Sequence, residues 1–212
     1  MAMALLDLSL VPVWFYAYSA VAYGIAAIVS LLVGYFAYQI FKRSGVKPGL
    51  IMAVSFFLLT IGFAALTLSS IINYVSGSAM EVFENLGRIN NLAFFAYYIL
   101  SAVSYSILLL MYLPKKFRFH VLYVPLWYLS SDLFHILSLG LVGAIFAINL
   151  IGYLKKKNGD KGLVLLAFAF IAVYHFVLFA LPFNVTLYLI AHLILVLGFL
   201  SLFFMLVRVR GK

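Results

Sequence analysis

The sequence predicts an all-α integral membrane protein, built as a bundle of seven transmembrane helices. Of its 212 residues, 67% are hydrophobic and only 9% are charged. Soluble domains carry roughly 25% charged residues, so a chain of this composition cannot cover a water-facing surface. Its apolar residues form several runs long enough to cross a bilayer, and its cations stand in short clusters between those runs.

Five apolar runs are each long enough to cross ~30 Å of hydrocarbon at ~1.5 Å of helical rise per residue. They cover residues 12–40, 50–72, 89–113, 163–182 and 185–207. Residues 1–10 lack the cationic start of a signal peptide, and the first run is followed by Lys42 and Arg43. We therefore expect the first run to be a retained span.

The stretch 118–154 is best explained by two spans. A single helix would put Arg118 and the lysine triple 155–157 on opposite sides of the membrane, although both clusters are typical of cytoplasmic loops. A short span over 117–130 and a longer one over 132–154 remove this conflict. Ser130, Ser131 and Asp132 would form the turn and the N-cap between them. The fourth helix would then be only ~20 Å long.

Seven spans place the charges consistently. The loops 42–47, 114–118 and 155–161 and the tail 208–212 all fall inside, and together they hold every Lys and Arg except Arg88. The positive-inside rule then predicts an outside N-terminus and an inside C-terminus. We treat the chain, 1–212, as a single transmembrane domain of a multi-pass protein, located in the cell (plasma) membrane.

An internal duplication is predicted from weak but ordered similarity between the two ends of the chain. Residues 42–45 align with 156–159, and the next span pairs Phe57 with Phe170 and Phe63 with Phe176. One span later, Asn90 aligns with Asn184 and Met111 with Met205. These pairs predict a 3+1+3 architecture with a three-helix unit at 12–113, a linker helix at 117–130 and a second three-helix unit at 132–208.

This architecture resembles that of SWEET-type sugar transporters, which implies a polar pathway between two three-helix halves. The proline-glutamine pair typical of that family is absent from spans one and five. Seven-helix rhodopsins share the helix count and orientation, but span seven has no lysine between Val185 and Val207 to carry a retinal. The resemblance is one of architecture, and fold does not carry function.

Three histidines are the residues most indicative of chemistry. His135, His175 and His192 lie in spans five, six and seven, at depths of ~6–10 Å below the outer surface by helical rise. Asp132 lies three residues before His135, on the same helix face. Polar groups inside hydrocarbon are costly, so a cluster of them indicates a functional site. In the aligned first half these histidines correspond to Val21, Gly62 and Tyr98.

Three imidazoles and a carboxylate suit a divalent metal ion, zinc first and non-haem iron second. Asp132 would be a fourth ligand, an orienting group or a general base, and an open ligand position would activate water for hydrolysis. Progestin/adipoQ receptors and alkaline ceramidases are similar in holding zinc through intramembrane histidines, but this chain has no second histidine four residues after His192. Haem ranks below a bare metal, because it would leave one histidine and Asp132 without a role.

Three functions remain open at this stage. The first is metal-dependent hydrolysis of a lipid-like substrate that enters from the bilayer. The second is transport of a small solute through a SWEET-like polar pathway, and the third is a noncatalytic membrane scaffold or sensor in which the histidines bond helices together. The chain has no cysteine and no nucleotide fingerprint, and its clustered cations do not form a nucleic-acid surface.

Overall fold

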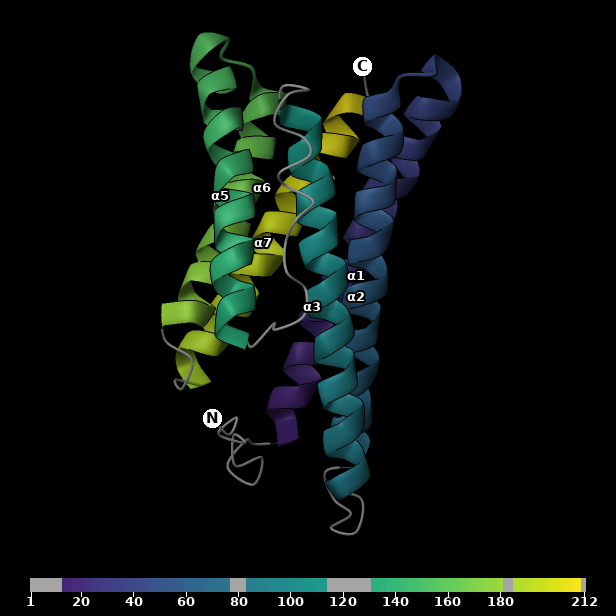
Figure 1. Ribbon diagram of the computed structural model, residues 1–212, viewed down its shortest axis with the longest axis vertical. Helices are drawn as coiled ribbons and strands as arrows, with labels where there is room; N and C mark the ends of the chain where they lie inside the picture. Colours follow the sequence, from purple (N-terminus) through teal and green to yellow (C-terminus); the bar gives the residue numbers. More distant parts are fainter. Residues whose placement is uncertain (1–12, 77–82, 114–130, 181–184, 211–212) are drawn as a thin grey trace.

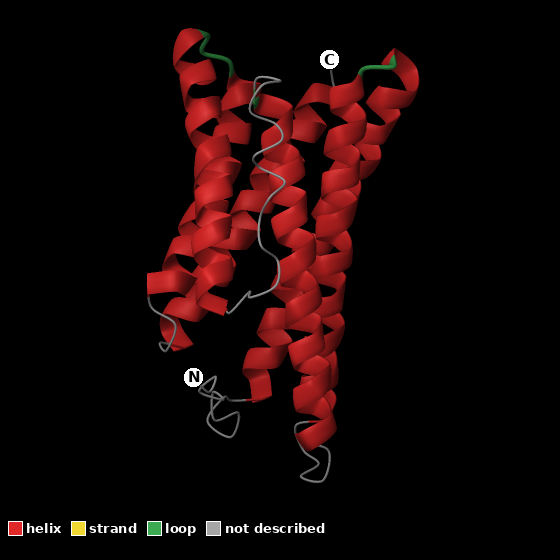
Figure 2. Cartoon of the chain, in the orientation of Figure 1, coloured by secondary structure: helices red, strands yellow, loops and turns green. Residues whose placement is uncertain are grey.

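The computed structural model describes residues 13–76, 83–113, 131–180 and 185–210, and over these residues the chain consists of helices and short turns (Figure 2). Six helices form, each long and apolar enough to cross a membrane. Their bounds are α1 Val13–Ser44, α2 Lys47–Ser76, α3 Phe83–Tyr112, α5 Ser131–Lys155, α6 Gly159–Ala180 and α7 Val185–Arg210. No strand forms within these described segments. The all-helical class is confirmed, and the six apolar helices support an integral membrane protein.

The helices extend further than the apolar runs that predict them. α1 continues through Lys42 and Arg43, and α6 begins inside the loop expected at 155–161. The gap between the second and third apolar runs is also partly helical, since α2 reaches Ser76 and α3 starts at Phe83. Hydropathy marks only the apolar part of a helix, whereas its backbone bonds continue into the interface, where long cationic side chains reach water. The fourth helix expected at 117–130 lies outside the described residues.

Two tight turns lie at the same end of the bundle, one between α1 and α2 and one between α5 and α6 (Figure 1). Gly45 ends α1 with a φ of 68° and donates its N–H to the Phe41 carbonyl at 2.8 Å. Asn158 caps α6, because its side-chain oxygen accepts from the Asp160 N–H at 3.0 Å.

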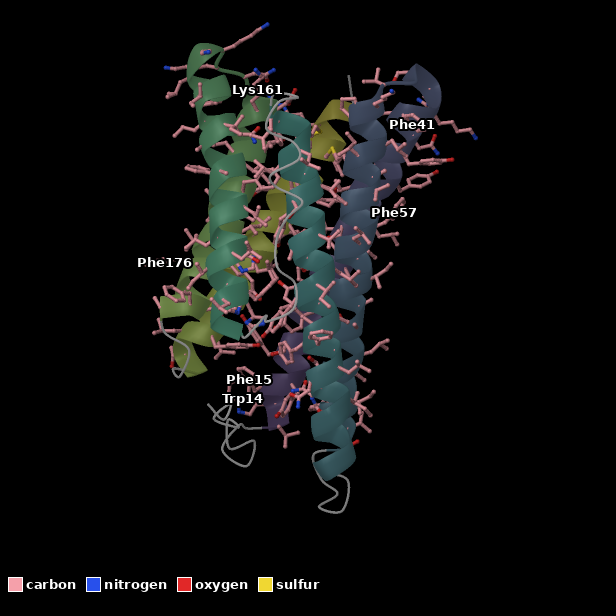
Figure 3. All side chains as sticks on the ribbon, viewed as in Figure 1. Trp14, Phe15, Phe41, Phe57, Lys161 and Phe176 are labelled. Atoms are coloured by element: carbon pink, nitrogen blue, oxygen red, sulfur yellow. The ribbon has the colours of Figure 1, made fainter. Side chains whose placement is uncertain are left out.

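All charged residues with described side chains lie at this end, which we call the basic end. They are Lys42, Arg43, Lys47, Lys155, Lys156, Lys157, Asp160, Lys161 and Arg208. Trp14 and Phe15 lie near the opposite end, far from Lys161 (Figure 3). A bundle with this charge distribution fits a bilayer with one strongly cationic interface.

The six helices pack as two groups of three consecutive neighbours. α2 lies between α1 and α3 in the first group, and α6 lies between α5 and α7 in the second (Figure 1). The groups meet where α1 packs on α7 and α3 packs on α5. The core between them is apolar and strongly aromatic, with Phe63, Tyr97 and Phe199 almost completely buried.

The buried faces of the two groups follow the same spacing. In α2 the buried residues include Ser55, Phe56, Leu59, Gly62, Phe63 and Leu66, and in α6 they are Ala167, Phe168, Ile171, Tyr174, His175 and Leu178. Each α6 position is 112 residues after its α2 counterpart, and the same shift relates buried Tyr23 in α1 to His135 in α5. The two phenylalanines that the sequence alignment pairs differ in burial: Phe63 is buried, whereas Phe176 is 55% exposed.

A glycine brings α6 and α7 into close contact. A Cβ on Gly198 would lie 3.2 Å from the Ala167 carbonyl oxygen and 3.2 Å from Ile171 Cγ1. We expect Gly198→Val to lower the free energy of unfolding by about 1–3 kcal/mol, because the helix backbones would have to separate. Gly152→Val is the matched control, since a Cβ there meets nothing within 4 Å. Thermal unfolding in detergent should separate the two variants, and equal midpoints would contradict the close-packing argument.

Candidate functional site

Two of the three predicted histidines are in direct contact inside the bundle. His135 on α5 and His175 on α6 are both buried, and their Nδ1 atoms lie 3.1 Å apart. In a hydrogen bond between two neutral imidazoles, one Nδ1 carries the proton and the other accepts it. The pair therefore joins α5 to α6, and it places two ring nitrogens side by side in the buried interior.

A tyrosine from the first helix group faces the outer nitrogen of this pair. The Tyr105 hydroxyl on α3 lies 3.5 Å from His175 Nε2, at the long limit for a hydrogen bond. Tyr105 is completely buried. The contact connects α3, α6 and α5 in the order Tyr105, His175, His135.

His192 on α7 is held separately from the pair. Its Nδ1 lies 2.8 Å from the Tyr188 backbone carbonyl, and a carbonyl can only accept, so Nδ1 carries the proton. In neutral His192 the other nitrogen, Nε2, then presents a lone pair. Nε2 is buried and has no hydrogen-bond partner among the described residues. An unsatisfied buried acceptor of this kind costs about 1–3 kcal/mol, so it calls for a structural or functional explanation.

Tyr174 contacts all three histidines. The centre of its ring lies 5.0 Å from that of His175, 6.0 Å from His192 and 6.4 Å from His135. The structure places it in the middle of the cluster, where one aromatic ring contacts both the histidine pair and His192.

The first helix group contributes further tyrosines that the sequence did not single out. The Tyr23 hydroxyl on α1 lies 3.0 Å from the Tyr188 hydroxyl on α7, and the Tyr23 ring lies 4.9 Å from the ring of His192. The chain has fifteen tyrosines. Only their packing distinguishes these from exposed tyrosines such as Tyr35 and Tyr74, so no local sequence signal could have identified them.

The predicted four-residue metal site is not assembled as one group. Over the segments that the structure describes, no three His, Cys, Asp or Glu side chains lie close enough together to hold a metal ion. The histidines divide into a pair and a single residue. The Asp132 side chain lies outside the described set, so its place as a ligand or base stays a prediction.

Asn90, in the first half of α3, bonds to the neighbouring helix α2. Asn90 Oδ1 accepts hydrogen bonds from the Ser69 hydroxyl at 2.9 Å and from the Asn73 amide at 3.2 Å, both on α2. It therefore joins α2 to α3.

No protein-family profile matches this sequence, and no curated protein or solved structure is significantly similar to it. The chemistry of the site is that of two adjacent imidazole nitrogens, one nearby phenol and one imidazole lone pair without a partner. Among the described residues no charged side chain accompanies these groups. Neutral imidazoles in such surroundings are metal ligands or hydrogen-bond partners.

Proposed function

We propose that this protein binds one divalent metal ion within the membrane through Nδ1 of His135 and Nδ1 of His175. The observation that carries the proposal is their separation of 3.1 Å. Two nitrogens bound to one tetrahedral zinc ion at about 2.0–2.1 Å are roughly 3.3 Å apart. Both rings would bind the same ion after a change of a few tenths of an ångström in this separation, a rotation that directs both Nδ1 lone pairs at one point, and transfer of the shared proton away from Nδ1. Zinc is the first choice of metal, and non-haem iron is the second.

The surroundings of His175 support this role. A metal-binding histidine usually donates its second N–H to a fixed acceptor, which sets the tautomer and the direction of the ring. The Tyr105 hydroxyl is placed to accept from His175 Nε2 at 3.5 Å. With metal on Nδ1, the His175 proton would move to Nε2 and shorten this contact.

Asp132 and His192 are the proposed further ligands. Asp132 is about one helical turn before His135, a spacing that lets both side chains reach one ion. His192 has its Nδ1 proton fixed by a carbonyl and its Nε2 lone pair free, as a metal ligand requires. It would join the site if the Tyr174 ring moved aside. A water at an open ligand position, with Asp132 as general base, would allow hydrolysis of a lipid-like substrate.

The proposed seven-helix topology has its own support. α3 ends at the basic end and α5 begins at the opposite end, so a crossing between them at 117–130 would complete a 3+1+3 arrangement. The shared shift of 112 residues between α1 and α5, and between α2 and α6, favours duplication. The basic end would face the cytoplasm of a cell membrane.

Elemental analysis of detergent-purified protein tests the metal proposal. We expect about one equivalent of zinc or iron in the wild type and none in the double variant His135→Ala, His175→Ala. Metal content that is equal in the two proteins, or absent from both after reloading with zinc, would overturn the proposal. A red preparation with a Soret band would replace the bare ion with haem.

A second candidate function is transport, and one feature favours it. Polar groups of both helix groups meet in the centre of the bundle, Tyr105 with His175 and Tyr23 with Tyr188. A polar path between two halves would use such contacts. Solute flux into liposomes without chemical change, retained when metal is removed, would favour transport over hydrolysis.

A further inference from the structure

A dense group of cations lies around the α5–α6 turn, apart from the histidine cluster. Lys155, Lys156 and Lys157 end α5 and form the turn, Lys161 lies in the first turn of α6, and Arg208 stands near the end of α7. All five are exposed. Asp160 is the one acid in this group, so the group keeps a net charge of about +4 over a short stretch of membrane interface.

Arg208 is held in place by two features of α6. Its Nε lies 3.2 Å from Asp160 Oδ1. Its guanidinium group also lies over Gly159, where a Cβ would come within 2.6 Å of Nη1. The absence of a side chain at Gly159 therefore makes room for the guanidinium. Its ion pair uses Nε, so the two outer nitrogens remain suited to a phosphate group, which arginine binds through paired N–H donors.

Exposed apolar side chains lie within about one helical turn of these cations. Ile151 and Leu154 are 55% and 64% exposed on α5, and Phe204 and Val207 are 58% and 54% exposed on α7. Cations next to such side chains stand at the level of lipid headgroups, with the apolar residues at the level of the acyl chains. A soluble phosphate would use the cations and leave the apolar side chains without contact.

We propose that the α5–α6 turn and Arg208 form a binding site for an anionic phospholipid, whose headgroup phosphate contacts Arg208 and the neighbouring lysines and whose acyl chains lie along α5 and α7. The site is independent of the metal proposal, because it lies at the basic end and shares no residue with the histidine cluster.

Native mass spectrometry of the full-length protein in detergent tests this proposal, with dioleoyl phosphatidylglycerol as the probe and dioleoyl phosphatidylcholine as the neutral comparison. We expect the anionic lipid to bind more tightly. Each cation near the headgroups contributes roughly a fivefold factor to the binding of an anionic lipid. The triple variant Lys155→Gln, Lys156→Gln, Lys157→Gln should therefore weaken the binding by about a hundredfold. Arg208→Gln alone should weaken it at least fivefold, and this variant remains informative if the triple variant does not fold.

The matched control removes the same charge from the other turn, as Lys42→Gln, Arg43→Gln, Lys47→Gln. This variant should keep the binding at the α5–α6 turn. Equal losses in the two triple variants would indicate a general charge effect and would overturn the proposal. Equal binding of the anionic and the neutral lipid would also overturn it. Displacement of the lipid by millimolar glycerol 3-phosphate would identify a site for free phosphate and would also overturn it.

Discussion

Zinc at one hundred times its Kd should raise the free energy of unfolding of the wild-type protein by about 2.7 kcal/mol, and that of His175→Ala by nothing. A ligand that binds only the folded state stabilises it, and removal of His175 takes away one of the two nitrogens that lie 3.1 Å apart. The measurement is thermal unfolding in detergent, after removal of bound metal with a chelator, with and without added zinc.

A matched control and a third variant sharpen this test. Ser138 is a buried α5 residue about one turn from His135, and its hydroxyl has no hydrogen-bond partner among the described residues. Ser138→Ala should keep the full stabilisation by zinc. His192→Ala tests whether the single histidine is a further ligand. If zinc stabilises this variant less than the wild type, His192 is a ligand; if zinc stabilises both equally, it is not. Stabilisation of His175→Ala equal to that of the wild type would contradict the histidine-pair site.

The composition and the apolar runs were sufficient to predict the helical class and the approximate position of six helices, because both depend on local sequence. The sequence did not predict the rotation of each helix about its axis closely enough to say which of two adjacent residues faces the core. One residue turns a side chain by about 100°, which is enough to move it from the core to the lipid. Phe63 and Phe176, which the sequence alignment pairs, differ in this way, since Phe63 is buried and Phe176 is 55% exposed.

The candidate site was predictable only in part. Helical rise placed His135, His175 and His192 at similar depths, and all three are buried. Depth does not fix which side chains are neighbours across the bundle, however. The Tyr174 ring contacts both the pair and His192, and the partners Tyr105 and Tyr23 come from the other helix group. Contacts between distant segments such as these depend on the packing of whole helices.

Phe63→Ala should lower the free energy of unfolding by about 3 kcal/mol. Phe63 is completely buried on α2, and its ring centre lies 5.2 Å from those of Tyr97 on α3 and Phe199 on α7 and 6.3 Å from that of Tyr23 on α1. Truncation leaves a cavity where four helices meet. The loss should fall at the lower end of the range for Phe→Ala in protein cores, because lipid already solvates apolar side chains when the helices separate.

Phe176→Ala is the matched control for Phe63→Ala, since the two phenylalanines are paired in the sequence alignment of the two halves. Phe176 is 55% exposed and points outward from α6 (Figure 3), so its truncation should change the stability by less than about 0.5 kcal/mol. Equilibrium unfolding with SDS in mixed micelles can measure both variants. A large loss for Phe63→Ala alone supports the 112-residue correspondence, in which the counterpart of Phe63 is His175. Equal losses would instead make the two phenylalanines equivalent, with α2 and α6 related in the register of the sequence alignment.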